Sequence, residues 1–516
     1  MFYLQALSYG MLYFGYGEVV ILLEIKNLSV KYAEAEAESL HKFSLSVKKG
    51  ECVLLTGASG CGKTTVTRCL NGLIPNFYSS EMQGEIFING REISTLSMKE
   101  IASLTGSVFQ DPRSQFFTLD VDSEIAFPCE NLGLAQAEIQ ERVLSATRLT
   151  NITHLLGKKV TELSSGQKQS VAIASACALR PKILVLDEPS ANLDREATER
   201  LKRILLNLKN TGTTILIAEH KIYWLAGLCD RMIYLDNGRK RMELSSEEFC
   251  RMKTDESRNL GLRCVSFYRK EMEKMTSLDF IEKIKGQQIS FHYHKEFPIF
   301  DELDFSLPSG EVIGIVGENG IGKSTLARLC VGLEQPQRGD ILFNGKKCSK
   351  KDRIQKSYYV MQDVDYQLFS DSVLGELILG NEDDKKTNET AIQILDRLGI
   401  LSYKDRHPGS LSGGEKQRVT IAVALMKNAE ILLFDEPTSG LDGRNMLRVS
   451  DLLKDLAKQG KTVLVISHDA ELLLETSAHL LYLERCRAPT LIPFCKENQE
   501  QIYRILFSER SKNNEQ

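Results

Sequence analysis

The chain has 516 residues, of which 42% are hydrophobic and 26% charged, so it is long enough for two or three globular domains of ordinary composition. Its formal net charge of −4 argues against a nucleic-acid-binding protein, for which an excess of Lys and Arg is expected. Its 12 cysteines are scattered without a C-x-x-C pair, which favours free thiols in a reducing compartment over a disulfide framework or a zinc site.

An uncharged, aromatic-rich run occupies the first 17 residues. It is shorter than the roughly 18–20 apolar residues that span a bilayer, and Gly10, Gly15 and Gly17 interrupt it. It is not preceded by the basic residues with which a secretory signal begins. We therefore expect residues 1–20 to be an N-terminal extension, and no other stretch of the sequence is apolar enough to cross a membrane.

Strand-like and helix-like patterns follow one another through the first half of the chain. Asn89-Gly90 is a strong turn signal at the end of one strand pattern. Continuous apolar runs fit parallel strands that are covered on both faces. Strands are predicted at residues 19–32, 45–56 (with a turn inside), 84–90, 183–187 and 213–220, and helices at residues 63–72, within 120–160 and at 163–178.

Two glycine-rich stretches, residues 57–65 and residues 317–325, both fit the phosphate-binding pattern G-x-x-x-x-G-K-[ST]. Glycine is needed because the backbone must turn tightly and bring its N–H groups against phosphate oxygens. The lysine reaches the β and γ phosphates, the next hydroxyl ligates Mg²⁺, and the helix that follows presents a partial positive charge to the anion. The predicted nucleotide-binding residues of these loops are Gly57, Ser59, Gly60, Gly62, Lys63, Thr64, Thr65, Gly317, Asn319, Gly320, Gly322, Lys323, Ser324 and Thr325.

The same order of features occurs twice, with a period of a whole domain. Asp435 follows Asp187 by 248 residues, and His468 follows His220 by the same number. The lysines of the two loops are 260 residues apart, so the first copy contains 12 extra residues after its loop. The chain is therefore predicted to be a tandem duplication. Its predicted parts are the extension 1–20, a first domain 21–245, a linker with a helix 246–284, a second domain 285–485 and a polar, frayed tail 486–516.

Two carboxylates end a predicted buried strand in each half. The aspartate of each pair, Asp187 or Asp435, can hold Mg²⁺, and the glutamate that follows it can orient or activate the water that attacks the γ phosphate. A histidine ends a later strand in each half, 32 residues after the glutamate, and this recurrence favours a γ-phosphate sensor over a structural histidine. The predicted catalytic residues are Glu188, Glu436, His220 and His468.

This series of motifs resembles that of ATP-binding cassette (ABC) ATPase domains. The second copy has Leu-Ser-Gly-Gly-Glu at 411–415, Leu-Leu-Phe-Asp-Glu-Pro at 432–437, Ser-Gly-Leu-Asp at 439–442 and Ile-Ser-His at 466–468. The combination is highly specific, and it covers both halves. The resemblance implies an α/β fold of two tandem ABC-type nucleotide-binding domains, each a P-loop parallel-sheet core with an antiparallel β subdomain and a helical subdomain. It also implies two ATP molecules held between head-to-tail domains.

In this family, each ATP site takes its phosphate loop from one domain and its Leu-Ser-x-Gly signature from the other. Residues 57–65 would then be completed by Ser412, Gly413 and Gly414, and residues 317–325 by Ser164, Ser165 and Gly166. The resemblance also assigns adenine stacking to Tyr32 and Tyr293, for which an ordinary strand tyrosine is an equal alternative. The cofactors implied are ATP and Mg²⁺, with Thr64, Gln110, Asp187, Ser324, Gln362 and Asp435 as metal ligands.

The first signature departs from the family pattern at two positions. Ser165 stands where glycine is usual, and Ser170 stands where the second copy has Arg418. We expect the site that uses this signature to be the slower one. Both copies retain the lysine, the glutamate and the histidine, so two hydrolysis-competent sites are predicted, and a purely structural or binding role is disfavoured.

The glutamine loops resemble those of one branch, the ATPases of energy-coupling factor (ECF) transporters. Each has a glutamine, a second glutamine five residues later and a phenylalanine seven residues later, although Val364 departs from the usual proline. The branch implies a peripheral ATPase on the cytoplasmic face of the cell membrane, which powers uptake of a vitamin or transition-metal ion. The partners implied are a transmembrane T component and a substrate-binding S component, with membrane contact through these partners only. The residues of the pattern are Gln110, Gln115 and Phe117, and Gln362, Gln367 and Phe369.

Two other ABC functions stay open. A soluble tandem ATPase that acts on ribosomes typically has a long, charged helical linker, whereas the linker here is short and not strongly basic, so no nucleic acid is expected as a partner. The ATPase of a sugar importer commonly has one degenerate signature, whereas both are mostly intact here. The sequence does not identify the transported substrate, because the ATPase does not touch it.

Overall fold

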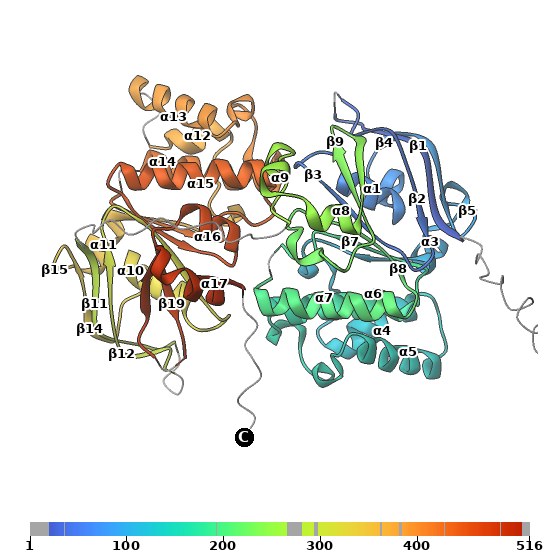
Figure 1. The fold of residues 1–516 in the computed structure, drawn as a ribbon, viewed down its shortest axis with the longest axis horizontal. Coiled ribbons are helices and arrows are strands. Elements are labelled where there is room, and N and C mark those ends of the chain that lie inside the picture. Colours follow the sequence, from blue (N-terminus) through green and yellow to red (C-terminus); the bar gives the residue numbers. More distant parts are fainter. Residues whose placement is uncertain are drawn as a thin grey trace, which may run out of the picture.

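The computed structural model describes residues 20–35, 37–191, 193–265, 281–293, 298–361, 364–380, 384–427, 429–485 and 487–507. These residues form two α/β halves that lie side by side (Figure 1). Nearly all of the predicted N-terminal extension lies outside the described residues, and so does Gln362. The duplication is confirmed, because each half contains one six-stranded and one four-stranded sheet with the same strand order.

A mainly parallel six-stranded sheet forms the centre of the first half. Its strands are β3 (Cys52–Gly57), β6 (Thr105–Val108), β7 (Ile183–Asp187), β8 (Thr214–Ala218), β9 (Arg231–Asp236) and β10 (Arg239–Ser245). Their spatial order is β10-β9-β3-β8-β7-β6, and only β10 is antiparallel to its neighbour. β3, β7 and β8 are almost entirely buried, which explains the continuous apolar runs in the sequence.

The second half repeats this sheet. Its strands are β13 (Val312–Gly317), β16 (Ser357–Val360), β17 (Ile431–Asp435), β18 (Thr462–Ile466), β19 (His479–Leu483) and β20 (Thr490–Pro493). Their order is β16-β17-β18-β13-β19-β20, with β20 antiparallel to β19. Each phosphate loop therefore follows a central strand, β3 or β13, that lies between two parallel neighbours.

An antiparallel sheet packs beside each core sheet. The first consists of β1 (Ile21–Tyr32), β2 (Leu40–Lys48), β4 (Ser80–Ile88) and β5 (Arg91–Glu92), and the second of β11 (Glu282–Phe291), β12 (Phe300–Pro308), β14 (Arg338–Phe343) and β15 (Lys346–Lys347). The helix after each phosphate loop, α1 (Lys63–Leu70) or α10 (Lys323–Val331), packs in the hydrophobic core between the two sheets. The two sheets thus hold the helix that begins at the phosphate loop.

The opposite face of each core sheet is covered by further helices. In the first half these are α4 (Val121–Asn131), α5 (Gln136–Leu149), α6 (Ser165–Ala178) and α7 (Arg195–Asn210), and in the second α12 (Val373–Ile378), α13 (Lys385–Arg397), α14 (Gly413–Met426) and α15 (Gly443–Lys458). α4 and α5 lie at the bottom of the first half, whereas α12 and α13 lie at the top of the second (Figure 1). The halves are therefore inverted relative to each other. Four short helices complete the domains: α2 (Leu73–Asn76), α3 (Met98–Leu104), α11 (Lys350–Lys356) and α16 (Ala470–Thr476).

The linker was predicted to contain a helix, and two short helices, α8 (Ser246–Arg251) and α9 (Thr254–Asn259), follow β10 there. The structure differs in that β11 begins at Glu282, inside the predicted linker, and in the tail. The tail was predicted to be frayed, and this is wrong for residues 490–507. Most of them form β20, which pairs with β19, and α17 (Gln499–Phe507), which packs against this edge of the sheet through the fully buried Ile502. The polar composition of the tail hid the single apolar face by which it docks.

Within the ranges that the structure describes, none of the helices combines the length and apolar character needed to cross a bilayer. The described cysteines are all free thiols, and most of them are buried, which confirms the expectation of unpaired cysteines for this part of the chain.

Candidate nucleotide sites

The two phosphate loops have matching backbone geometry. Gly62 and Gly322 cap the helices α1 and α10 with φ angles of 104° and 105°, in the left-handed region that disfavours other residues. A Cβ atom at Gly62 would lie only 2.7 Å from the carbonyl oxygen of Ser39. Glycine is thus required both by the turn and by the close approach of the neighbouring strand, and the helix N-terminus points its N–H groups into the loop.

Each loop lysine lies within its own loop. Lys63 Nζ donates to the carbonyl oxygens of Gly57 and Ala58, both at 3.1 Å. Lys323 Nζ makes the same two bonds in the second loop, at 2.8 and 3.0 Å. Both lysines are buried, so their positive charges are concentrated at the loops, where an anion would bind.

A hydroxyl and a carboxylate meet at each candidate metal position. Thr64 Oγ1 lies 3.4 Å from Asp187 Oδ1, and Ser324 Oγ lies 3.3 Å from Asp435 Oδ2. Burial raises the pKa of both aspartates, and the neighbouring glutamate adds to this effect. Paired oxygen donors of this kind fit a small divalent cation such as Mg²⁺.

Glu188, after β7, is held by two side chains. His220 Nε2 lies 3.3 Å from one carboxylate oxygen, and Gln110 Nε2 donates to the other at 2.9 Å. Burial opposes ionisation of this carboxyl group, but the nearby His220, Lys63 and Lys221 together outweigh burial, and the pKa of Glu188 falls below its ordinary value. The backbone at Glu188 has φ of 44°, and strained backbone of this kind often marks a functional residue.

Glu436, after β17, has the same backbone conformation with φ of 50° but a different set of partners. Its carboxylate accepts the backbone N–H of His468 at 2.9 Å and the hydroxyl of Ser467 at 3.0 Å. Burial raises its pKa. The His468 ring instead contacts the Asn319 side chain of the phosphate loop, at 3.0 Å.

The two candidate adenine-stacking tyrosines differ in their surroundings. The Tyr32 hydroxyl contacts Thr65 Oγ1 at 3.4 Å and accepts from Arg68 at 3.3 Å, so the ring lies beside the helix that starts at the first loop. Tyr293 is half exposed and makes an edge contact with Phe291, with ring centroids 4.9 Å apart. Tyr293 also interacts with Arg328 of α10, so both tyrosines lie beside the helix that follows a phosphate loop.

Both predicted signatures lie at the start of a helix. Ser164 caps α6 through a reciprocal pair of hydrogen bonds with Gln167. Ser412 and Glu415 form the same capping box at the start of α14. A Cβ at Gly166 would lie 2.5 Å from Ala197 Cβ, so packing requires glycine there. A Cβ at Gly413, the counterpart of Ser165, would meet no atom within 4 Å.

The signatures' neighbours connect the two halves. The backbone N–H of Ser59, in the first loop, donates to Asp442 Oδ2 at 2.7 Å. Asn445 donates to the same carboxylate at 3.2 Å, and Arg418 Nη1 donates to Asn445 Oδ1 at 3.0 Å. On the other side, burial lowers the pKa of both Lys323 and His468, and the charge of Asp194 in the first half opposes this shift in both. Each phosphate loop thus faces a carboxylate of the opposite half.

The second glutamine of each glutamine loop fixes the loop by hydrogen bonds to the backbone. The sequence showed the spacing of these glutamines but not this role. Gln115 accepts the Phe109 N–H at 3.2 Å and donates to the Ser107 carbonyl at 2.9 Å. Gln367 makes the equivalent bonds to Met361 and Tyr359, at 2.7 and 2.8 Å. Both glutamine loops are therefore hydrogen-bonded to the edge strand of their core sheet, β6 in the first half and β16 in the second.

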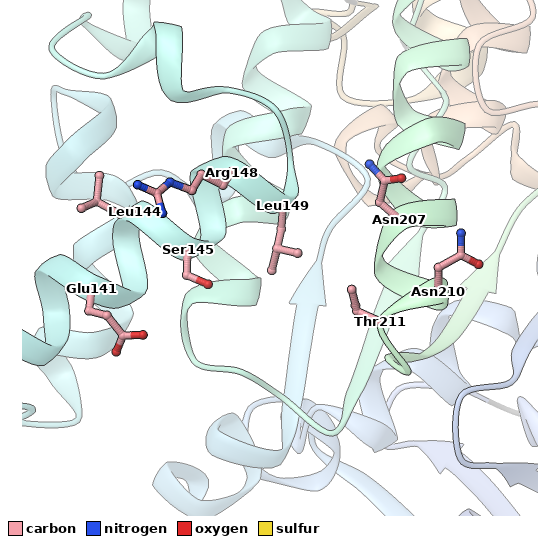
Figure 2. Close-up of a pocket in the computed structure, with 8 residues that line it drawn as sticks. All are labelled: Glu141, Leu144, Ser145, Arg148, Leu149, Asn207, Asn210 and Thr211. Atoms are coloured by element: carbon pink, nitrogen blue, oxygen red, sulfur yellow. The ribbon is translucent and has the colours of Figure 1, made fainter.

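A hollow of about 670 Å³ lies away from these sites, between α5 and the end of α7 (Figure 2). Arg148 and Leu149 line one side of it, and Asn207 and Asn210 line the other. None of the predicted site residues lines this hollow.

Comparison with known proteins identifies the family. A family model described as ABC transporter matches residues 40–191 and 300–439, which together are more than half of the chain. The chain belongs to the ABC transporter family. A Treponema denticola protein described as a candidate ABC transporter ATP-binding protein is 40% identical over 474 residues, covering 90% of this chain and 95% of that protein. As a member of this family, the chain is an ATPase that binds and hydrolyses ATP.

Two further comparisons extend over both ABC domains. The candidate HMP/thiamine import ATP-binding protein YkoD of Bacillus subtilis is 32% identical, over 90% of each chain. A structure described as ribosome-bound archaeal Pelota and ABCE1 has a TM-score of 0.65 over 92% of this chain and 80% of that chain, at 24% identity. At that identity the structural match confirms the predicted fold of two tandem ABC domains and nothing more.

Proposed function

We propose that this ABC ATPase energises an ECF-type uptake transporter and that it holds two ATP molecules between its halves. Each phosphate loop would bind phosphate through its N–H groups and its lysine, and the signature helix of the other half would cover the γ phosphate. The hydrogen bond from Ser59 to Asp442 supports this pairing, because it joins the first loop to the half that carries the second signature.

Hydrolysis would follow from the carboxylates beside the loops. Glu188 and Glu436 orient a water whose oxygen attacks the γ phosphorus, the bond to the bridging oxygen of ADP breaks, and the water proton passes to the carboxylate or to phosphate. His220 and His468 contact the γ phosphate. Mg²⁺, when bound with ATP, supplies positive charge that offsets the charge of the phosphates. The residues that would hold it are Thr64, Gln110 and Asp187 in the first half and Ser324, Gln362 and Asp435 in the second.

The observation that carries the transporter role is a pair of exposed phenylalanines, one in each half. Phe117 is 74% exposed and Phe369 is 78% exposed. The backbone that presents each ring is clamped by a buried glutamate: Glu124 accepts the Phe117 N–H at 3.0 Å, and Glu376 accepts the Phe369 N–H at 2.8 Å. A fixed backbone that presents a large apolar side chain to water, in both halves, is best explained by an apolar partner.

The partner that fits is a helix of the transmembrane T component. The exposed rings follow directly after the braced glutamine loops, so the same segment connects the first nucleotide site, through Gln110, to the docking surface. Leu119, which is 78% exposed, extends the apolar surface in the first half. Hydrolysis would then move the T helix and reorient the S component.

The name of YkoD assigns that protein to HMP/thiamine import, which favours a vitamin-type substrate here as well. In this proposal the protein is peripheral, on the cytoplasmic face of the cell membrane. The fold likeness to ABCE1 supplies no residue-level argument for a ribosomal role.

Affinity purification from detergent-solubilised membranes tests the transporter role. The parent chain should recover a small multi-span membrane protein, and a Phe117→Ser/Phe369→Ser variant should lose it while retaining ATP binding. A Leu144→Ser variant, which changes an exposed apolar residue of α5 away from the glutamine loops, is the matched control. Recovery of ribosomes instead of a membrane protein would reject the proposal.

A further inference from the structure

Residues 258–265, which comprise the end of α9 and the chain that follows it, cross from the first half to the second half. Arg258 forms an ion pair with Glu475 of α16. A Cβ at Gly443, the first residue of α15, would lie 2.1 Å from the Leu262 carbonyl oxygen. This crossing segment is therefore packed tightly against two helices of the second half, although the sequence predicted it as linker.

Arg263 is the most deeply inserted residue of the crossing segment. Its side chain is 2% exposed, and its guanidinium pairs with Asp469 and, at 2.9 Å, with Glu471. The Cys264 N–H also donates to Glu471, at 3.2 Å. Both acids are themselves buried, so the three charges depend on one another for compensation.

The carboxylate that Arg263 binds is connected to the candidate catalytic glutamate. Asp469 donates its backbone N–H to Ser467 Oγ at 3.0 Å, and that hydroxyl donates to Glu436 Oε2 at 3.0 Å. Asp469 also accepts the Thr438 hydroxyl at 2.6 Å, two residues beyond Glu436. Asp469 thus links Arg263 to the loop that orients Glu436: its carboxylate is held by Arg263 and Thr438, and its backbone N–H holds the Ser467 hydroxyl that binds Glu436.

The first half orients its own glutamate without such a contact. Lys221 and Tyr223 stand at the positions of Asp469 and Glu471, so this loop offers no acidic pair to an arginine. Ser190 is the counterpart of Thr438 in this half, and its hydroxyl donates at 2.6 Å to the buried Glu219 instead of to a residue at the Asp469 position.

We propose that Arg263 is a positioning residue for hydrolysis at the second phosphate loop, supplied by the first half of the chain. It holds Asp469, and through Ser467 it keeps the Glu436 carboxylate aimed at the attacking water. The inference rests on the proposed role of Glu436. Its consequence is one-sided: loss of Arg263 slows hydrolysis at residues 317–325 and leaves hydrolysis at residues 57–65 unaffected.

The test uses the full chain in two parent variants. Glu188→Gln leaves hydrolysis to the second loop, and Glu436→Gln leaves it to the first. In the Glu188→Gln parent, Arg263→Met should lower the maximal single-turnover rate about 10-fold or more, as expected for a misplaced reacting group, and should change the half-saturating ATP concentration less than about threefold. In the Glu436→Gln parent both values should stay within about twofold.

Two further variants separate positioning from folding. Arg263→Lys keeps the positive charge and should recover most of the rate. Arg258→Met removes the other ion pair of the crossing segment, which does not contact Asp469, and should leave both parents' rates within about twofold. If Arg263→Met does not fold, Arg263→Gln/Asp469→Asn removes one charge of each sign and should show the same selective loss of rate.

An equal loss of rate in both parents, or an unchanged rate in the Glu188→Gln parent, would overturn the proposal. If the Glu188→Gln parent hydrolyses no ATP at all, the assignment of Glu436 as an independent catalytic base fails first, and the inference fails with it.

Discussion

The two candidate nucleotide sites share a backbone but hold their glutamates differently. Glu188 is held by the side chains of His220 and Gln110, whereas Glu436 is held by the Ser467 hydroxyl and a backbone N–H. The nearby histidine lowers the pKa of Glu188, and burial raises that of Glu436. The duplication thus kept the loop geometry while the electrostatic environment of the two carboxylates diverged.

The contacts between the halves are also unequal. Arg418 and Asn445 connect the second signature helix to Asp442, which binds the first loop. The equivalent positions of the first half are Ser170 and Ala197, which cannot form that chain of hydrogen bonds. The site that combines the first loop with the second signature is therefore the more firmly connected, which agrees with our expectation that the first signature serves the slower site.

The largest effect is expected from the glutamates. Glu188→Gln/Glu436→Gln should lower the ATPase kcat about 100-fold or more, because the amide cannot accept a proton from the attacking water. Each single variant should lower it strongly, and Glu188→Gln should cost more if the first loop belongs to the faster site. Steady-state phosphate release measures all three. Full turnover in either single variant would mean that one site does not hydrolyse ATP.

A smaller loss of ATPase rate is expected from breaking the series of hydrogen bonds that runs from Arg418 through Asn445 and Asp442 to the first loop. Arg418→Ser, which copies the first half, leaves Asn445 without its donor and loosens Asp442. Loss of a hydrogen bond from a buried charged group is worth about 1.5–3 kcal/mol, so we expect the rate at the first loop to fall by about 10-fold to 100-fold.

That rate is measured in the Glu436→Gln parent. The matched change Ser170→Ala in the other half removes only a bond within α6, to the Gly166 carbonyl, and should leave the rate at the second loop within about twofold. Equal effects of the two changes would mean that this series of hydrogen bonds does not make the sites unequal.

Much of each half could be predicted from local sequence, whereas the contacts between halves could not. The phosphate loops and the signature caps depend on residues within a few positions, and the strand-end carboxylates follow from continuous apolar runs. Ser59 and Asp442, by contrast, are 383 residues apart, and no local pattern brings them together. Arg263 lies in a segment of mixed charge, and only its burial against Asp469 distinguishes it from a linker arginine.

Replacing a signature glycine by alanine should lower the free energy of unfolding at Gly166 and raise it at Gly413. Gly166→Ala would place Cβ 2.5 Å from Ala197 Cβ, and overpacking of this kind costs about 1–3 kcal/mol. Gly413→Ala enters open space at the start of α14 and should stabilise the second half by about 0.5–1 kcal/mol through its higher helix propensity. Denaturant midpoints of the two variants measure the difference, and a loss of stability in both would show that Ser165 was not freely tolerated.

The smallest effect concerns the candidate metal position of the second half. Tyr359 donates to Asp435 Oδ2 at 2.8 Å, the same oxygen that Ser324 contacts, whereas in the first half Thr67 donates to Asp187 at 3.2 Å. Tyr359→Phe removes a donor that competes with a cation for this carboxylate. A single neutral hydrogen bond is worth about 1 kcal/mol, so the Mg²⁺ concentration for half-maximal hydrolysis should fall about threefold to fivefold in the Glu188→Gln parent. The same variant in the Glu436→Gln parent should leave the Mg²⁺ dependence unchanged, and a shift there as well would mean that Tyr359 acts on the fold rather than on Asp435.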